Sequence, residues 1–294
     1  MEVRVLERLS TFTPLGLRFW DAAFQRPVED GLTAEAWPWE ARDGRATRAV
    51  PTFSGALAFH GLPGLRAVER EGPEVDLGSP PTRRFLVEVR DAKRRYAPAA
   101  FAVELPLPYR GPFLGPGVAS PGAAPGFQLL TGPDRPRPGA LAAVRGELAW
   151  AATGAPVPWA LVEVADPDGG LWRGLADAEG RFAVVLPWPA LEEVTPGSPP
   201  VGPAGALAGR SWPITLSVRA TAAGLPAIGP TGLPDYALLP VQPAEPVWPA
   251  PPDAAGAAPV PALALTLVHG ETLIVRTPGS ERSKLLVGAA PPSP

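Results

Sequence analysis

The sequence of 294 residues contains no cysteine and only two histidines, His60 and His269. Without cysteine, neither a disulfide framework nor a thiolate metal site can form. Two histidines are too few for a histidine metal cluster, and neither lies in a known catalytic motif. Glycine-rich phosphate-binding loops are missing as well. The sequence therefore predicts no metal ion, no cofactor, no catalytic residues and no enzymatic activity.

Charged residues are few and balanced in sign. Lysine and arginine together number 26 against 29 for aspartate and glutamate, a formal net charge of −3. No basic block occurs, so the electrostatic signature of a nucleic-acid-binding protein is absent. No apolar run of about 18 residues occurs either, and the N-terminus lacks the apolar region of a secretion signal. We predict no nucleic-acid partner, no membrane span and a cytoplasmic location.

Long segments without proline are scarce, because the chain contains 43 prolines and 32 glycines. A proline inside a helix costs about 3 kcal/mol, which argues against a helical protein. Hydrophobic residues nevertheless make up 46% of the chain and include nine tryptophans. This apolar area offsets the entropy cost of ordering the backbone. The composition predicts a folded, loop-rich, all-β protein.

Short runs in which apolar and polar residues alternate support this fold class, since the alternation is typical of strands with one buried face. Residues 85–89 and 101–105 form two such runs around a polar turn and predict a hairpin. The second half of the chain has six further runs, with a tight turn at 269–271, and these lie at 162–164, 182–186, 214–218, 263–267, 273–275 and 285–287.

The proline- and glycine-rich stretches divide the chain. We predict a β-sandwich at 1–110, an ordered connection at 111–137, a second β-sandwich at 138–288 and a disordered tail at 289–294. Two long inserts, at 195–209 and 225–261, are too rich in Pro, Gly and Ala to contain core strands, and such loops are commonly functional or mobile. Segments 19–28 and 148–157 both end in Pro-Val, which favours duplication of one sandwich unit.

Part of the second half resembles the carboxypeptidase regulatory-like domain. The likeness rests on three segments: Val144-Arg-Gly-Glu-Leu148, Thr153-Gly-Ala-Pro-Val-Pro-Trp-Ala-Leu-Val-Glu-Val164 and Ala176-Asp-Ala-Glu-Gly-Arg-Phe-Ala-Val-Val-Leu-Pro187. It implies a transthyretin-like, immunoglobulin-like sandwich without the peptidase of that family. Within the last segment, 177–180 predicts a hairpin loop in which Gly180 has a positive φ.

Four segments resemble proteins of contractile injection systems, which are phage-tail-like particles. They are Leu17-Arg-Phe-Trp-Asp21, Arg26-Pro-Val-Glu-Asp-Gly-Leu32, Ala58-Phe-His-Gly-Leu-Pro-Gly-Leu65 and Phe101-Ala-Val-Glu-Leu-Pro-Leu-Pro-Tyr-Arg-Gly111. The resemblance implies a structural or adaptor subunit, assembled into a particle through contacts with sheath, tube or baseplate proteins. Pairing with further copies of the same chain is a second expectation.

Closely spaced carboxylates at Asp166 and Asp168 raise the possibility of a calcium site. The calcium-loop pattern fails, however, because Gly170 and Leu171 occupy its fifth and sixth positions and Asp177 its twelfth. Aspartate and glycine also form tight turns without any metal. We therefore predict a turn here and no metal site.

Rigid aromatic side chains in proline-rich segments are the candidate contact residues, because such side chains bind proteins or carbohydrates well. The predicted partner-binding residues are Trp37, Trp39, Tyr109, Arg110, Phe113, Trp188 and Trp248. Two alternatives remain open. The tryptophans bind glycans in a surface-binding module, or they fold back and cover the ends of the sandwiches.

Overall fold

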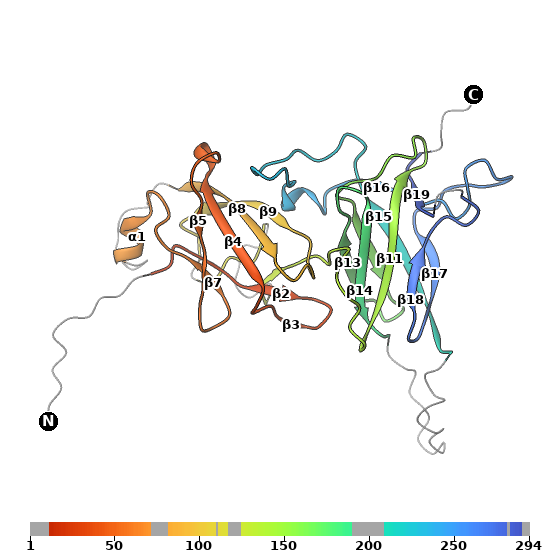
Figure 1. Cartoon of the computed structure of the whole chain (residues 1–294), viewed down its shortest axis with the longest axis horizontal. Coiled ribbons are helices and arrows are strands. Elements are labelled where there is room, and N and C mark those ends of the chain that lie inside the picture. Colours follow the sequence, from red (N-terminus) through yellow and green to blue (C-terminus); the bar gives the residue numbers. More distant parts are fainter. Residues whose placement is uncertain are drawn as a thin grey trace, which may run out of the picture.

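The structure is a computed structural model that describes residues 12–71, 82–109, 111–116, 125–189, 209–280 and 283–289. The predicted insert at 195–209 and the predicted disordered tail lie almost entirely outside these residues. Figure 1 shows two bodies of β-sheet side by side along the long axis. The predicted all-β class is confirmed, with one short α-helix, α1 (Arg66–Glu71), in the described part of the chain.

The first half contains three small sheets. Their orders are β5-β4-β8-β9, β1-β7-β6 and β10-β2-β3. The strands are β1 (Leu15–Leu17), β2 (Phe19–Asp21), β3 (Arg26–Pro27), β4 (Leu32–Pro38), β5 (Thr47–Arg48), β6 (Val50–Pro51), β7 (Leu57–Phe59), β8 (Arg83–Asp91), β9 (Ala99–Leu105) and β10 (Phe127–Gln128), and a 3-10 helix, η1 (Trp39–Ala41), follows β4. The predicted hairpin is confirmed as β8 and β9, in which Phe85 pairs with Val103.

The second half contains two sheets packed face to face. One has the order β14-β11-β18, with β19 also paired to β11, and the other has the order β13-β12-β15-β16, with β17 also paired to β15. The strands are β11 (Leu141–Trp150), β12 (Leu161–Ala165), β13 (Leu171–Leu175), β14 (Arg181–Pro187), β15 (Ser211–Arg219), β16 (Ala244–Glu245), β17 (Leu263–Val268), β18 (Thr272–Val275) and β19 (Leu285–Val287), with a 3-10 helix, η2 (Tyr236–Leu238), before β16. All six runs predicted in this half lie in strands.

Several strand pairings recur in the two halves, although β15–β16 has no counterpart among the described strands of the first half. In the first half β4 pairs with β5 and β8, β8 pairs with β9, and β10 runs parallel to β2. In the second half β12 pairs with β13 and β15, β15 pairs with β17, and β19 runs parallel to β11. The antiparallel pairs β1–β7 and β11–β14 also correspond. These pairings agree with the predicted duplication of one sandwich unit.

The two short segments that suggested a duplication have the same local structure. In both 19–28 and 148–157, the backbone N–H of the last residue donates to the carbonyl of the first, at 3.0 Å and 3.2 Å respectively. Gln25 and Gly154 occupy matching positions and both have a positive φ, 51° and 69°. The sequence repeat therefore corresponds to a repeated turn between two strands.

Each half has its own hydrophobic core, built from the apolar side of its strands. The core of the first half includes a cluster of aromatic rings in which Phe127 stacks on Phe101 with centroids 4.8 Å apart. Phe127 and Leu129 belong to the predicted connection, and both are buried in this core. The ordered core of the first half therefore continues past the predicted boundary at residue 110, as far as Leu129.

The turn at 177–180 has the predicted backbone but a different place in the fold. Gly180 has a φ of +78°, as predicted. Asp177 closes the turn, because its side chain accepts hydrogen bonds from the backbone of Glu179 and Arg181. The adjoining strands β13 and β14 pair within different sheets, so the segment crosses between the two sheets and the hairpin prediction is wrong. The residues of the turn itself do not determine with which strands β13 and β14 pair.

We predict that Gly180→Val lowers the free energy of unfolding by at least ~2 kcal/mol. A left-handed conformation alone costs an L-residue about 1–2 kcal/mol. A Cβ at this position would also lie 2.6 Å from the carbonyl oxygen of Leu148. The control is Gly256→Val, because Gly256 has a φ of +74° and nothing within 4 Å of its added Cβ. Denaturant unfolding measures both, and equal losses would show that the contact with Leu148 has no effect.

Candidate functional site

The two halves are joined by a buried polar cluster. Asp21 in β2 accepts a hydrogen bond from the Tyr96 hydroxyl at 2.5 Å and forms an ion pair with Arg135 at 2.7 Å. Asp21 and Arg135 are each only 3% exposed. Arg145 of β11 donates to the backbone carbonyls of Pro133 and Arg135. A continuous chain of polar contacts thus links β2 of the first half to β11 of the second.

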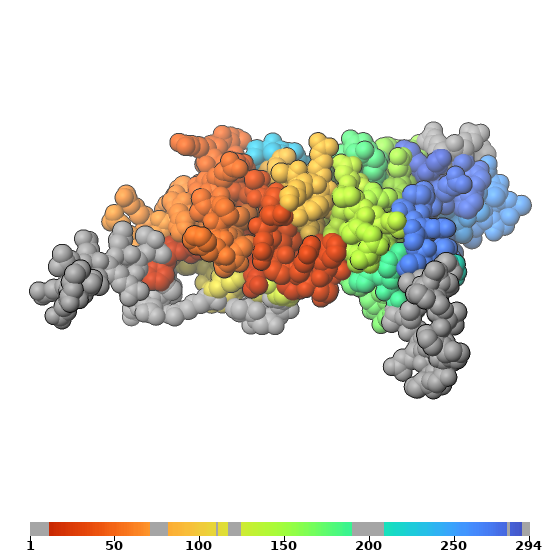
Figure 2. Space-filling view, turned by 60° about the horizontal axis from the view of Figure 1, so that its bottom comes forward, coloured from red at the N-terminus to blue at the C-terminus, as the bar shows by residue number. Residues whose placement is uncertain are grey.

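A second connection is made by the clamp segment, which we define as residues 225–240 of the predicted insert. Its Leu233 packs in a buried cluster with Trp37, Leu86 and Ala100 on the outer face of the first half. Its Thr231 hydroxyl lies 2.8 Å from both carboxylate oxygens of the buried Glu88. Figure 2 shows this segment in cyan among the orange and yellow surface of the first half. The clamp segment is therefore part of the interface between the halves.

Close backbone approach explains a glycine in the clamp segment. A Cβ on Gly229 would lie 2.0 Å from a carboxylate oxygen of Glu88. Arg42 of the first half donates to the carbonyl of the preceding residue, Ile228, at 3.0 Å. Tyr236 donates to the carbonyl of Gln128 at 2.7 Å, and burial raises the pKa of this tyrosine. These bonds hold the two halves together as one body.

We predict that Asp21→Asn lowers the free energy of unfolding by about 3–5 kcal/mol, because Arg135 would remain as a buried charge without its partner. The control is Lys93→Gln, which removes an exposed ion pair with Asp30. Exposed pairs contribute about 0–1 kcal/mol, so this variant should unfold almost like the wild type. Denaturant unfolding compares the two. A loss below about 1 kcal/mol for Asp21→Asn would contradict the structural role of the buried pair.

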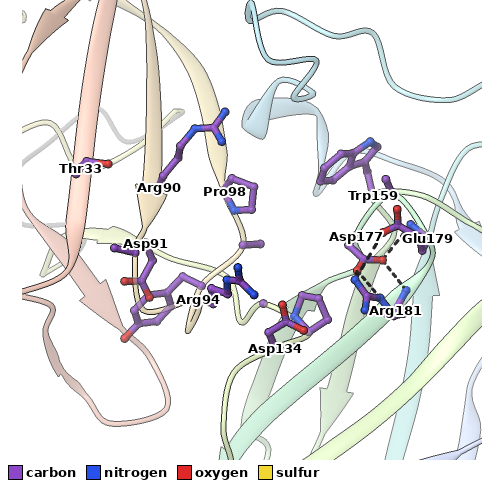
Figure 3. Close-up of a pocket in the computed structure, with 16 residues that line it drawn as sticks. Thr33, Arg90, Asp91, Arg94, Pro98, Asp134, Trp159, Asp177, Glu179 and Arg181 are labelled. Atoms are coloured by element: carbon purple, nitrogen blue, oxygen red, sulfur yellow. Dashed lines mark hydrogen bonds and ion pairs between the residues drawn. The ribbon is translucent and has the colours of Figure 1, made fainter.

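A cleft of about 580 Å³ lies between the halves. Figure 3 shows Arg90, Arg94 and Pro98 facing it from the first half, with Asp134, Trp159, Asp177, Glu179 and Arg181 on the opposite side. Two of its acidic groups are paired: Asp177 with Arg181 at 2.7 Å, and Asp91 with Arg95 at 2.9 Å. In the described part of the chain, no three His, Asp or Glu side chains converge in a metal-binding group. The cleft is thus lined by charged groups of both signs.

The candidate calcium loop is a hydrogen-bonded turn. One carboxylate oxygen of Asp166 accepts from the backbone N–H groups of Asp168 and Gly170, at 3.0 Å and 2.8 Å. The other oxygen accepts from the indole N–H of Trp172 at 2.7 Å. Turn formation therefore accounts for the orientation of Asp166.

A second cavity, the end groove, has a volume of about 810 Å³ and lies in the first half, away from the second half. It lies between the segment before β1, the β6–β7 turn, α1 and the chain after β9. Most of its lining is apolar, comprising Phe12, Pro14, Ala56, Ala58, Val68, Pro106, Leu107, Tyr109 and Pro112, with Arg18, Thr52 and Ser54 among the polar residues. This end of the molecule thus presents a hollow apolar surface.

An aromatic side chain projects from the rim of the end groove. Phe53 is fully exposed at the tip of the β6–β7 turn, and Val50 beside it is half exposed. The Phe53 turn, residues 52–56, is closed by a backbone bond from Thr52 to the carbonyl of Ala56 at 2.8 Å and by a bond from Ala56 N–H to the Thr52 hydroxyl at 3.1 Å. An ordered turn therefore holds a large apolar ring in solvent.

The structure places the predicted partner-binding residues in different environments. Trp37, Phe113 and Trp248 are buried, with Trp248 at 2% exposure and its indole N–H bonded to the carbonyl of Gly288. These three side chains expose little area that a partner could contact. Tyr109 lines the end groove, and Arg110 lies outside the described residues. Among the predicted partner-binding residues that the structure describes, Tyr109 alone lines the end groove.

The remaining two tryptophans are half buried, and their rings contact neighbouring side chains. Two guanidinium groups lie over the Trp39 ring, that of Arg84 at 3.8 Å and that of Arg42 at 4.5 Å from a ring centroid. Trp188 packs against the rings of Trp212 and His269, with centroids 5.8 Å and 4.7 Å away. Such contacts are expected under the alternative in which these side chains fold back and cover the sandwich ends.

Sequence reasoning did not select Phe53. The available signal was an aromatic residue between turn-forming residues, in Thr52-Phe-Ser-Gly55. Threonine, serine and glycine favour a tight turn, and a side chain at its tip has no neighbouring strand to pack on. An isolated exposed apolar residue is ordinary in a protein surface. Its position on the rim of an apolar groove is what makes Phe53 a candidate contact residue.

Comparisons with known proteins identify no family. No family model and no curated protein match the chain. Among solved structures, two mutant forms of the shaft pilin SpaA from Lactobacillus rhamnosus GG align with it at 10% identity. One alignment covers 95% of this chain and 100% of that chain with a TM-score of 0.22, and the other covers 96% and 99% with a TM-score of 0.21. Likeness at these scores carries no argument about function.

No helix in the described ranges is long and apolar enough to cross a membrane.

We predict that Tyr109→Phe leaves the free energy of unfolding unchanged or raises it by up to ~2 kcal/mol. The Tyr109 hydroxyl is buried and has no hydrogen-bond partner among the described residues, and an unsatisfied buried polar group costs about 1–3 kcal/mol. The control is Tyr236→Phe, which breaks the bond to Gln128 and should cost about 1 kcal/mol. A clear loss of stability in Tyr109→Phe would show that its hydroxyl has a partner.

Proposed function

We propose that this protein is a non-enzymatic structural or adaptor subunit that acts through protein–protein contacts at its end groove. The observation that carries the proposal is the combination of an apolar groove with the exposed Phe53 on its rim. Contact sites between proteins are typically apolar and contain well-positioned aromatic residues. Because the turn is closed by hydrogen bonds, its backbone loses little freedom on binding, which favours affinity.

The rigid junction between the halves supports this role. Inter-domain motion is expected when the interface is small and polar. Here a buried ion pair, a clamp segment and a buried apolar cluster that includes Leu130, Leu161 and Leu175 connect the two sandwiches. A protein with such a junction holds its two ends at a constant separation, as a spacer or adaptor in an assembly requires.

The assembly we propose is a contractile injection particle, as the sequence resemblance implies. A glycan-binding role has less support from the tryptophans. Sugars bind by stacking on an open aromatic face, and Arg42 and Arg84 already lie against the ring of Trp39. The groove is mainly apolar, whereas a sugar presents many hydroxyl groups that need polar partners.

We predict that the full chain co-sediments with purified particles and that Phe53→Asp lowers its content there by at least about tenfold, because a charged side chain would be desolvated at the contact. The matched control is Val241→Asp, since Val241 is an exposed apolar residue on the second half. This control should be incorporated normally, and mass spectrometry quantifies both.

Two results would overturn the proposal. Absence of the wild-type chain from particles would reject the injection-particle role, and retention of the chain on a glycan array would then favour the surface-binding alternative. Normal incorporation of Phe53→Asp would reject the end groove as the contact surface. Thermal unfolding of both aspartate variants checks that they are folded.

A further inference from the structure

We propose that the end groove is occupied by the Phe53 turn of a second copy of this chain, so that two copies pair about a two-fold axis. The inference deepens the proposed function, on which it rests, by naming the first partner in the assembly. The projecting side chain and the groove are both present on one copy, within the same surface of the first half. Each copy therefore both inserts a ring and receives one.

The position of the turn favours a closed pair over a growing filament. Thr52 and Ser54, on either side of Phe53, themselves line the groove, so the ring and its proposed binding site are adjacent. A two-fold axis beside this rim brings the same patch of both copies together, as in an isologous interface. Ring and groove at opposite ends of the molecule would instead form an open, head-to-tail array.

The shape and chemistry of the groove suit an aromatic ring. Its volume of about 810 Å³ lies within the range of roughly 300–1,000 Å³ typical of ligand sites. Its walls include prolines, aliphatic side chains and the exposed ring of Phe12. By contrast, the exposed Leu171, Val241 and Ile274 all lie in the second half. The exposed large apolar side chains among the described residues of the first half are Phe12, which lines the groove, and Val50 and Phe53, which lie within two residues of the lining residue Thr52. We call this set and the groove the patch.

Two complementary charges flank this patch. Arg18 lines the groove, and its side chain is exposed. Glu29 lies against the Phe53 turn, since its Cγ would be 2.9 Å from a Cβ placed on Gly55. Among the described residues, neither side chain forms an ion pair. Insertion of Phe53 into the opposite groove carries Glu29 of one copy toward Arg18 of the other, and the symmetry makes this contact twice.

The test is the association state of the purified full chain, measured by analytical ultracentrifugation over a range of concentrations. We expect a monomer–dimer equilibrium for the wild type. Arg18→Glu and Glu29→Arg should each weaken pairing at least about tenfold, because each places like charges in contact. The combined variant Arg18→Glu/Glu29→Arg should recover the wild-type dissociation constant within about threefold, since it restores opposite charges.

Phe53→Asp should abolish pairing, while Val241→Asp should pair like the wild type. Thermal unfolding of each variant shows whether it is folded. The proposal is overturned by a wild type that stays monomeric, by a dimer that Phe53→Asp leaves intact, by association that continues beyond the dimer, or by a combined charge variant that recovers no pairing.

Failure of this inference is distinguishable from failure of the proposed function. A monomeric chain that still enters particles through Phe53 would reject self-pairing and show that a different protein occupies the groove. A chain that forms dimers but is absent from particles would support self-pairing and reject the injection-particle role. Ultracentrifugation of the purified chain and mass spectrometry of particles give these two answers independently.

Discussion

The buried ion pair between Asp21 and Arg135 is the interaction on which the arrangement of the two halves depends. Both groups have been removed from water, so the cost of their desolvation is offset only while they remain in contact. Asp21 ends β2, and Arg135 lies in the connection that Arg145 binds through two backbone carbonyls. Separation of the halves would break the bonds from Arg145 to this connection, so the ion pair and these bonds together oppose it.

The long proline-rich segments form part of this junction and of the first core. Residues 225–240 cover the outer face of the first half, where Leu233 packs on Trp37 and Thr231 binds Glu88. The connection likewise contributes Phe127 to the first core. Proline restricts the backbone of such segments in the unfolded chain, so ordering them costs less entropy. In this protein, residues of the proline-rich segments therefore form much of the contact within and between the two halves.

The contact surface we propose lies where this internal packing ends. In the second half Trp248 and Leu286 form a buried cluster with Ala149, which lies in β11 just before the turn that matches 19–28. At the opposite end of the molecule the groove and the Phe53 ring have no comparable cover among the described residues. The two halves thus differ: the second carries the clamp segment, and the first carries the proposed contact surface.

The β class, eight of the strands, the positive φ of Gly180 and the repeat of 19–28 at 148–157 were predictable from the sequence, because alternation and turn chemistry are local properties. Only the tertiary structure decided that Trp37 and Trp248 are buried, that 177–180 crosses between sheets, and that Phe53 borders a groove. Asp21 and Arg135 are 114 positions apart. Their contact depends on the packing of segments far apart in sequence. A local sequence pattern does not specify which distant residue a side chain will contact.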